Sequence, residues 1–265
     1  MVRGQSRAKI RMTDARHVAA PVVTAHEIGV NFRALADGAG VCHGIYRTGD
    51  VTAIDFDGAR RLRDEFEISR YIDLRTSGER QRHGDATALR AAGIAITTCA
   101  IASNDQSAIV VRRPGSDAYV RYYLAILESM QLRVAELFSC IASMKGVPFL
   151  FGCHAGKDRT GLVAMLLLHA CGASAEVIAQ DYQRSGPYLL RRLDRFRAHW
   201  ESKGETRDDY AVRLLTRAET MRQVICELNT DHGGVGGYLT RSGVAADDLR
   251  SIRHHYANGQ NGLTP

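Results

Sequence analysis

The chain has 265 residues, of which 45% are hydrophobic and 24% charged, and its formal net charge is +6. This length and apolar content allow one large domain or two small ones with a sizeable core, and they exclude a chain that is disordered throughout. The longest apolar run, Leu162 to Leu168, is far shorter than the ~20 residues that cross a bilayer. The N-terminal residues are rich in Arg but lack the apolar stretch of a secretory signal, so we predict a cytoplasmic protein without a membrane span.

The first hundred residues alternate between predicted strands and helices. Residues 1–25 are polar, basic and aperiodic, which favours a flexible arm, and residues 26–265 are predicted to form a single domain. Short strands are predicted at 44–47, 68–74 and 94–99 from their β-branched and apolar residues. Apolar residues at helical spacing predict a helix over 53–66 with Thr52 as its N-cap. The polar stretch 75–84 is interpreted as a turn.

Helices are predicted to dominate the rest of the chain. A loop is expected over 103–116 and a long amphipathic helix over 117–144, which Gly146 ends. The apolar run 147–151 is typical of a buried central strand, and 161–170 of a buried helix. Further helices are expected over 174–183 and within 187–228. This alternation predicts an α/β fold with a central, mostly parallel sheet flanked by helices.

One segment joins a buried strand to a buried helix through a short polar loop. In open α/β sheets, ligands bind at the carboxyl ends of the strands. A tight loop that enters a helix there directs several backbone N–H groups at one point, which favours phosphate binding. The sequence therefore predicts a phosphate-binding loop made of Cys153, His154, Ala155, Gly156, Lys157, Asp158, Arg159, Thr160 and Gly161.

The side chains of this loop favour nucleophilic attack on phosphorus. The five residues between Cys153 and Arg159 let the loop curl around the sulfur, while the guanidinium lies at the rim. The helix dipole and the inward N–H groups stabilise a thiolate there. Arg159 can hold two equatorial phosphate oxygens bidentately. Thr160 can donate a hydrogen bond to the sulfur, and Gly156 and Gly161 allow close backbone approach.

The spacing of Cys and Arg alone decides nothing. With 6 Cys and 31 Arg in the chain, chance predicts about 0.7 matches to Cys-x5-Arg. The Gly at 156, the hydroxyl at 160 and the Gly at 161 lower this expectation to the order of one in a thousand. The alternative interpretation is a buried structural Cys beside a surface Arg.

The loop sequence CHAGKDRTG resembles the signature of the Cys-dependent tyrosine and dual-specificity phosphatase superfamily. The whole pattern is most similar to a bacterial tyrosine-phosphatase group with mycobacterial members. The resemblance implies a phosphatase fold with a helical lid over 187–220, Cys153 as the nucleophile and no cofactor. Shorter motifs of that group are matched along residues 29–260, at Asn31-Phe32-Arg33, Tyr46-Arg47-Thr48, Asp73-Leu74-Arg75, Glu79-Arg80, Asp181-Tyr182 and Gly237-Tyr238-Leu239.

Two positions depart from the wider superfamily. Many members have a His immediately before the nucleophile, where this chain has Gly152. Many also take the general acid from a separate loop upstream, where this chain offers Asp105. The bacterial group carries a Lys-Asp pair inside the loop, so Asp158 is the first candidate and Asp105 the second. The alternatives are that Asp158 only braces the loop by hydrogen bonds and that Asp105 is a solvated loop residue.

Further charged residues have two interpretations each. Lys157 faces the phosphate or a second anionic group, or it is solvated. Asp73 and Arg75 are expected to brace the site rather than react. The segment 184–197 contains five arginines, Arg184, Arg191, Arg192, Arg195 and Arg197. It can bind a second phosphate or form a solvated helix face with ion pairs such as Arg191–Asp194, and we favour the solvated helix face.

The sequence thus predicts a phosphomonoester hydrolase that acts on a phosphorylated protein or on a small-molecule phosphate, such as a phosphoinositide or a nucleotide-like metabolite. No metal-ligand spacing is visible, so neither a metal nor another cofactor is expected. A non-catalytic phosphate-binding module is a second hypothesis, suggested by Gly152. The scattered positive charge argues against a nucleic-acid partner. The oligomeric state stays open.

Overall fold

The computed structural model describes residues 28–102 and 117–258, which form a five-stranded sheet between layers of helices. The strands lie in the order β1-β2-β5-β3-β4, with β5 in the centre. All neighbours pair in parallel except β1 and β2, so the prediction of a mostly parallel sheet is confirmed. The strands are β1 Arg33–Ala34, β2 Ile45–Thr48, β3 Arg70–Asp73, β4 Ala95–Thr98 and β5 Phe149–Gly152.

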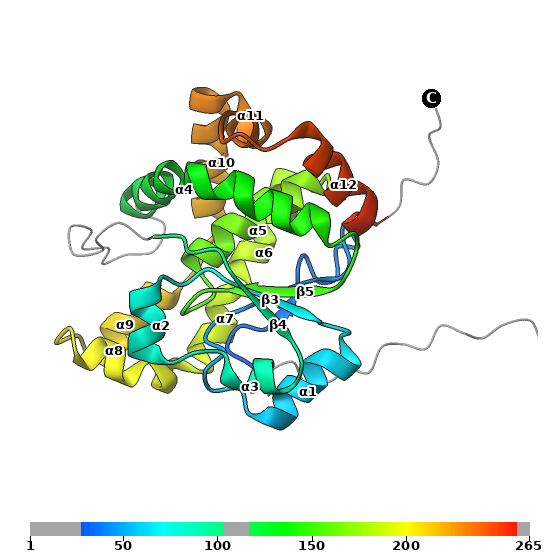
Figure 1. Ribbon diagram of the computed structural model, residues 1–265. Coiled ribbons are helices and arrows are strands. Elements are labelled where there is room, and N and C mark those ends of the chain that lie inside the picture. The colour runs from blue at the N-terminus through cyan, green and yellow to red at the C-terminus, as the bar shows by residue number, and fades with distance from the viewer. Residues whose placement is uncertain (1–27, 103–116, 259–265) are drawn as a thin grey trace, which may run out of the picture.

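Helices cover both faces of the sheet (Figure 1). On one face lie α1 (Phe56–Glu65) and α3 (Thr87–Ala91), which share an apolar cluster with Leu150 of β5. Phe149 and Phe151 point to the opposite face, because side chains alternate along a strand. That face is covered by α4 Asp117–Ser143, α5 Asp158–Ala170, α6 Ala175–Gln183, α10 Ala218–His232, α11 Gly234–Arg241 and α12 Ala246–Tyr256.

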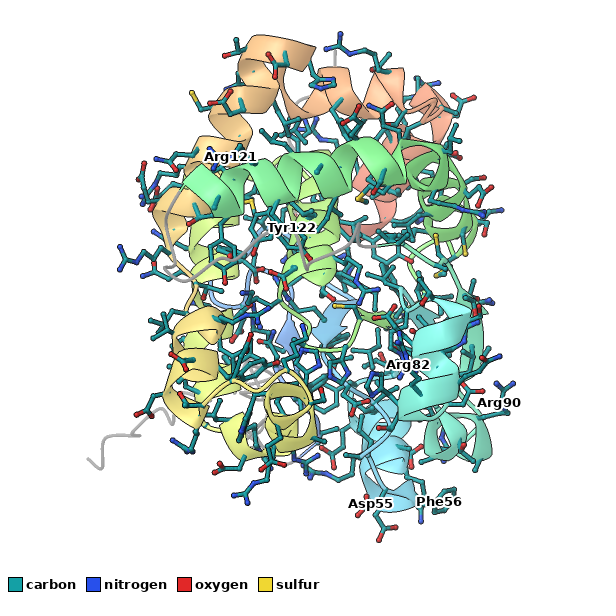
Figure 2. All side chains as sticks on the ribbon, turned by 90° about the vertical axis from the view of Figure 1, so that its left-hand side faces the viewer. Asp55, Phe56, Arg82, Arg90, Arg121 and Tyr122 are labelled. Atoms are coloured by element: carbon teal, nitrogen blue, oxygen red, sulfur yellow. The ribbon has the colours of Figure 1, made fainter. Side chains whose placement is uncertain are left out.

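Two further groups of helices flank the carboxyl ends of the strands (Figure 1). The first is α2 (Ser77–His83). The second is a run of short helices within residues 185–214, here called the lid: α7 Ser185–Leu190, η2 Leu193–Phe196, α8 Arg197–Glu201 and α9 Arg207–Leu214. The lid has an apolar cluster of its own, which includes Phe196, Trp200 and Tyr210. Figure 2 looks at this side of the molecule, with Arg82 on α2 and Tyr122 on α4.

The structure corrects two local predictions. Residues 77–83 form a helix rather than a turn, because Thr76 and Glu79 make a capping box at its start. This helix buries no residue, so it gives no hydrophobic period to read. Helix α1 begins at Phe56, and its N-cap is Asp55, whose side chain accepts from the N–H of Gly58 at 2.8 Å.

Several predictions fall on residues outside the described ranges. The basic arm over 1–25, the loop over 103–116 and the second general-acid candidate Asp105 all lie there. Among the helices of the described residues, none is long and apolar enough to span a bilayer.

Candidate active site

The loop from β5 to α5 is pressed against the end of β2. A Cβ atom on Gly152 would lie 2.6 Å from the carbonyl oxygen of Thr48. A Cβ on Gly156, where φ is +68°, would lie 2.5 Å from the same oxygen. Neither position has room for a side chain, because two backbone segments meet there, so a His would not fit at position 152 in this arrangement.

Cys153 lies at the centre of the loop, at the N-terminal end of α5. Its side chain is buried, with 3% exposed, and the Thr160 hydroxyl donates to its sulfur at 3.1 Å. The contact predicted between Thr160 and the sulfur is therefore present. Gly161 lets Tyr182 approach closely, because a Cβ there would lie 3.1 Å from the tyrosine ring.

Arg159 is held from one side by a carboxylate on α2. Its two terminal nitrogens donate to the oxygens of Glu79 at 2.7 and 2.5 Å, and Nη1 also donates to the carbonyl of Ile101 at 3.1 Å. Burial alone would raise the pKa of Glu79, but the hydrogen bonds and charge of Arg159 lower it to about 2. A guanidinium has five N–H donors in a planar fork. These contacts leave the edge formed by Nε and Nη2 for a ligand.

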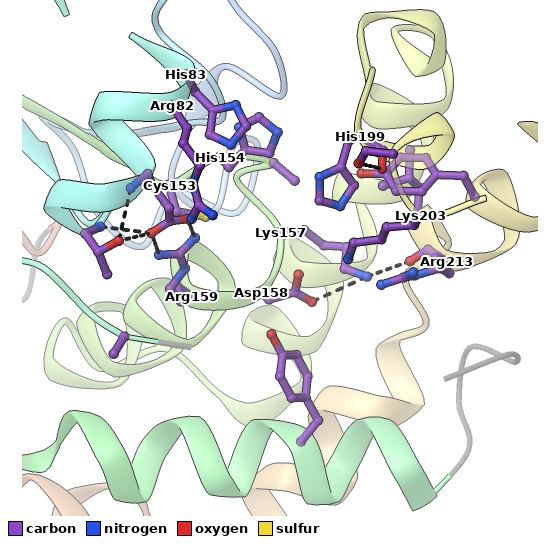
Figure 3. A pocket seen from close by; sticks show the side chains of 18 of the residues that line it. Arg82, His83, Cys153, His154, Lys157, Asp158, Arg159, His199, Lys203 and Arg213 are labelled. Atoms are coloured by element: carbon purple, nitrogen blue, oxygen red, sulfur yellow. Dashed lines mark hydrogen bonds and ion pairs between the residues drawn. The ribbon is translucent and has the colours of Figure 1, made fainter. Parts of the chain in front are cut away.

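Asp158 lies in the first turn of α5 with its carboxylate at the pocket (Figure 3). The hydroxyl of Tyr123 donates to its Oδ1 at 2.7 Å, and that hydroxyl also shares a 2.6 Å hydrogen bond with Tyr182. The side chain of Asp158 keeps 23% exposure. The carboxyl group is thus fixed in orientation and still open to a reacting group.

Lys157 lines the pocket and is not solvated, so one of its two predicted environments is excluded. It is buried, with 4% exposed, and its Nζ donates to the backbone carbonyl of Arg213 in α9 at 2.6 Å. The ammonium also lies 3.4 Å from Asp158 and 4.7 Å from the centre of the Tyr119 ring. Burial alone would lower the pKa of Lys157, but Asp158 raises it above the usual range, so Lys157 stays charged. The residue ties the lid to the phosphate-binding loop.

A buried ionic network supports the loop from below. Arg47 and Asn31 both donate to the carbonyl oxygen of Gly156, at 2.8 and 2.7 Å. Arg47 also pairs with Asp181, and Arg33 donates to the backbone carbonyl of Asp181 at 2.8 Å. In a trans peptide the C=O and the next N–H point in opposite directions. The two donors therefore turn the N–H of the following residue, Lys157, towards the inside of the loop.

The Asp73–Arg75 pair braces the site, as predicted. Both side chains are fully buried, and Arg75 Nη2 lies 2.7 Å from Asp73 Oδ2. Arg75 also donates to the carbonyl of Gly84, at the end of α2, at 3.2 Å. The pair thus fixes α2, which carries the partner of Arg159.

These elements enclose a pocket of about 590 Å³. Figure 3 shows Arg82, His83 and His154 on one side and His199, Lys203 and Arg213 facing them from the lid. Cys153, Ala155, Lys157, Asp158 and Arg159 line the pocket, as do aromatic rings from Tyr119, Tyr122 and Tyr210. Among the described residues that line it, five are Lys or Arg and two are Asp or Glu.

The Arg-rich segment 184–197 does not supply this charge. Arg184 pairs with Asp37, and Asp194 pairs with Arg207, which lies outside the segment. Within the described residues, none of the segment's five arginines lines the pocket. The cations at its mouth are instead Arg82, Lys203 and Arg213, which sequence reasoning did not single out.

The resemblance matched Glu79 and Tyr182 as parts of short motifs, but it assigned neither of them a contact with Arg159 or Asp158. Glu79 also had a local signal, the Thr76-x-x-Glu79 capping box. Tyr123 and Tyr182 lie on separate helices, and their spacing predicts no contact. Among the described residues, no group of three or more His, Cys, Asp or Glu side chains could hold a metal ion.

Comparison with known proteins agrees with this architecture. The family model of the tyrosine phosphatases matches residues 26–258. The chain therefore belongs to the tyrosine phosphatase family, and the predicted resemblance is confirmed. It is a phosphatase, a hydrolase of phosphoric monoesters.

Two relatives give the degree of similarity. A tyrosine-protein phosphatase of Nostoc commune is 29% identical over 216 residues, which cover 77% of this chain and 70% of the relative. The triple specificity protein phosphatase PtpB of Mycobacterium tuberculosis is 34% identical over 119 residues. That match covers 41% of this chain and 43% of PtpB, so it spans less than half of either protein.

Proposed function

We propose that the chain hydrolyses phosphomonoesters through a cysteinyl-phosphate intermediate on Cys153. The observation that carries the proposal is the geometry at the sulfur. Cys153 lies at the N-terminus of α5, receives a hydrogen bond from Thr160 at 3.1 Å, and shares its pocket with Arg159. Each of these features stabilises negative charge at one point.

In the first step the Cys153 thiolate attacks phosphorus. The S–P bond forms, the bond from phosphorus to the substrate oxygen breaks, and that oxygen takes a proton from Asp158. The free edge of Arg159 holds two equatorial oxygens, and Glu79 keeps this edge turned towards them. The inward N–H groups of the loop hold the rest of the developing charge.

In the second step water attacks phosphorus and gives a proton to the Asp158 carboxylate. The S–P bond breaks, inorganic phosphate leaves, and the Thr160 hydroxyl stabilises the departing thiolate. Asp158 is the acid of this scheme because it lies at the pocket and its orientation is fixed by Tyr123.

We propose phosphotyrosine in proteins as the substrate, with phosphoserine and phosphothreonine as further substrates. The tyrosine rings at the pocket offer flat apolar surfaces on which the ring of a phosphotyrosine can pack. The relatives named as a tyrosine-protein phosphatase and a triple specificity phosphatase support this substrate class. A small-molecule phosphate is the second candidate, because the cationic mouth of the pocket suits a strongly anionic substrate.

The test begins with p-nitrophenyl phosphate. We expect turnover by the wild type, none by Cys153→Ser, and a phosphorylated Cys153 in acid-quenched wild-type enzyme by mass spectrometry. Turnover by Cys153→Ser would exclude this sulfur as the nucleophile.

A series of aryl phosphates tests the general acid. Asp158→Asn should lose more rate as the leaving phenol becomes more basic, because a poor leaving group needs the proton most. Tyr123→Phe is the matched control for altered orientation of Asp158. An equal loss of rate for every leaving group would assign Asp158 to loop bracing instead.

A panel of phosphopeptides and small phosphates separates the substrate classes. A higher kcat/KM for the peptides supports the protein phosphatase, and a higher value for the small phosphates supports the second candidate.

A further inference from the structure

Three imidazole rings lie in contact across the mouth of the pocket, and each comes from a different element. His83 ends α2, His154 follows the nucleophile, and His199 lies in α8 of the lid. The rings of His83 and His154 are stacked at 4.6 Å, and those of His154 and His199 lie 5.8 Å apart. The proposed chemistry at Cys153 uses none of these rings.

The lid supports this histidine column on its apolar side. Phe196 packs edge-on against His154 at 5.7 Å, and Tyr210 lies 5.5 Å from His199. All three histidines line the pocket. The rings thus lie packed together in the lining of the pocket that also contains Cys153.

Charged groups surround the column on both sides. His154 is faced by Asp50 and Glu79 as well as by Arg159. His199 is faced by Lys203 and Arg213. Glu79 already pairs with Arg159 and Asp50 lies 3.9 Å from Arg75, so both carboxylates are near an arginine. The mouth of the pocket therefore has an excess of positive charge.

Burial and nearby positive charge lower the pKa of two of these histidines, His154 and His199. Burial and the charge of His83 lower the pKa of His154. Burial, Lys203 and the neighbouring histidines lower the pKa of His199 to about 4. Near neutral pH these two rings are uncharged, in a region where an anion would favour their protonation.

We propose that the histidine column, together with Arg82 and Lys203, forms a second anion site for a phosphate group of the substrate other than the one attacked by Cys153. Arg82 is exposed at the end of α2 and lines the pocket opposite Lys203 (Figures 2 and 3). A pocket of about 590 Å³ holds more than one phosphate group and its connecting ring. This inference rests on the proposed function, because the second group is defined relative to the one that reacts.

The site couples binding to proton uptake. A bound phosphate raises the pKa of the imidazoles that face it, so the complex takes up protons that the free enzyme lacks. Affinity for the second group therefore rises as pH falls, until the phosphate itself takes up a proton near pH ~6.

The test compares phenyl phosphate with the three phenylene bisphosphates, in which a second phosphate sits at the 2-, 3- or 4-position. Because a bisphosphate has two phosphates that can react, its kcat/KM should be about twice that of phenyl phosphate on statistical grounds alone. We expect at least one isomer to exceed this statistical ratio by about tenfold at pH 6.5, which corresponds to about 1.4 kcal/mol, and by less at pH 8.5. A ratio near two for all three isomers at every pH would overturn the second anion site.

Substitutions at position 199 separate a binding role from a structural one. His199→Asn should lower the ratio of kcat/KM for the bisphosphate to that for phenyl phosphate. His199→Arg should keep this ratio high and weaken its dependence on pH. His254→Asn is the matched control, because His254 is exposed on α12 and does not line the pocket. Equal ratios and pH profiles in the wild type and both His199 variants would contradict the proposal.

Two further arms complete the design. The best bisphosphate isomer is also prepared with its second phosphate as a hexadecyl phosphodiester, held in phosphatidylcholine vesicles. Comparing kcat/KM for the vesicle-bound and the soluble probe distinguishes a lipid headgroup from a soluble phosphate. A preference for either probe supports the site. If the wild type fails to hydrolyse phenyl phosphate, the proposed function itself fails. If it hydrolyses phenyl phosphate and shows no preference for a second phosphate, only the second anion site fails.

Discussion

The underside and the mouth of the phosphate-binding loop are both rich in charge, but they are built in opposite ways. Below the loop, Arg33, Arg47 and Asp181 are buried, and they pair with one another and with the loop backbone. At the mouth, Arg82 is exposed near the end of α2, and Lys203 is exposed in the turn that follows α8. Buried charges hold a geometry, because any displacement leaves an ion without its partner.

The two regions therefore have different tasks. The underside fixes the peptide that follows Gly156 and hence the shape of the catalytic loop. In the proposed function, the mouth surrounds the part of the substrate that does not react. Changes below should therefore affect folding and chemistry together, whereas changes at the mouth should affect the choice of substrate.

The largest effect is expected between the two regions, at the proposed nucleophile Cys153. Cys153→Ser should lose at least about 10⁴-fold in kcat, because a serine hydroxyl in this loop has no base to activate it. The measurement is the rate with p-nitrophenyl phosphate. Cys226→Ser, at an exposed thiol, is the control and should keep its rate. Comparable rates in the two variants would refute the assignment.

The underside is tested by Arg47→Met. The substitution leaves the buried carboxylate of Asp181 without its closest partner, so we expect a loss of about 3–5 kcal/mol in the free energy of unfolding. Urea titration followed by circular dichroism measures it. Arg60→Met, on the exposed face of α1, is the control. If both variants unfold at the same urea concentration, the underside does not hold the fold.

The contact between α2 and Arg159 is tested by Glu79→Gln. We expect kcat/KM to fall by about tenfold or more, because Arg159 loses the carboxylate that orients its free edge. Glu136→Gln, at an exposed ion pair, is the control.

The same variant predicts a change in acid stability. The pKa of Glu79 is about 2 in the folded state against an ordinary 4.5, so its contribution is complete above pH 4.5 and is lost as pH falls towards 2. The wild type should lose on the order of 2 kcal/mol more than Glu79→Gln across this interval. Parallel acid-unfolding curves for the two proteins would show that the ion pair does not stabilise the fold.

The smallest effect is expected where the lid meets α4. The Tyr119 hydroxyl donates to the Arg213 carbonyl at 3.0 Å, beside the bond from Lys157. Tyr119→Phe should weaken the docking of α9 by about 1 kcal/mol. Faster hydrogen exchange in residues 207–214, with exchange in α5 unchanged, is the expected result. Tyr46→Phe, on the opposite face of the sheet, is the control, and equal exchange in both variants would contradict the role of Tyr119.

The catalytic loop could be predicted from sequence because its signals are local. A buried strand, a short polar loop and a buried helix follow one another without a break, and the structure has the same order, with five residues between β5 and α5. The sheet could be predicted for the same reason, since its central strands are short apolar runs. The polar helix α2 buries no residue, so apolar periodicity could not indicate it.

The rest of the site depends on contacts between distant residues. Glu79 lies 80 residues from Arg159, and no spacing rule connects them. Lys157 looked like a residue facing a ligand or solvent, but α9 supplies a carbonyl for its ammonium only after the lid has packed. Three histidines spread from 83 to 199 indicate nothing until the fold stacks them.

The long reach of these contacts has a consequence for the order of folding. Asn31 bonds Gly156 across 125 residues, and Lys157 bonds Arg213 across another 56. Closing such large loops is slow, because the chain loses conformational entropy before the stabilising contacts form. We therefore expect a nascent chain to remain inactive until nearly all of it has left the ribosome, and refolding enzyme to recover activity after it recovers helical structure.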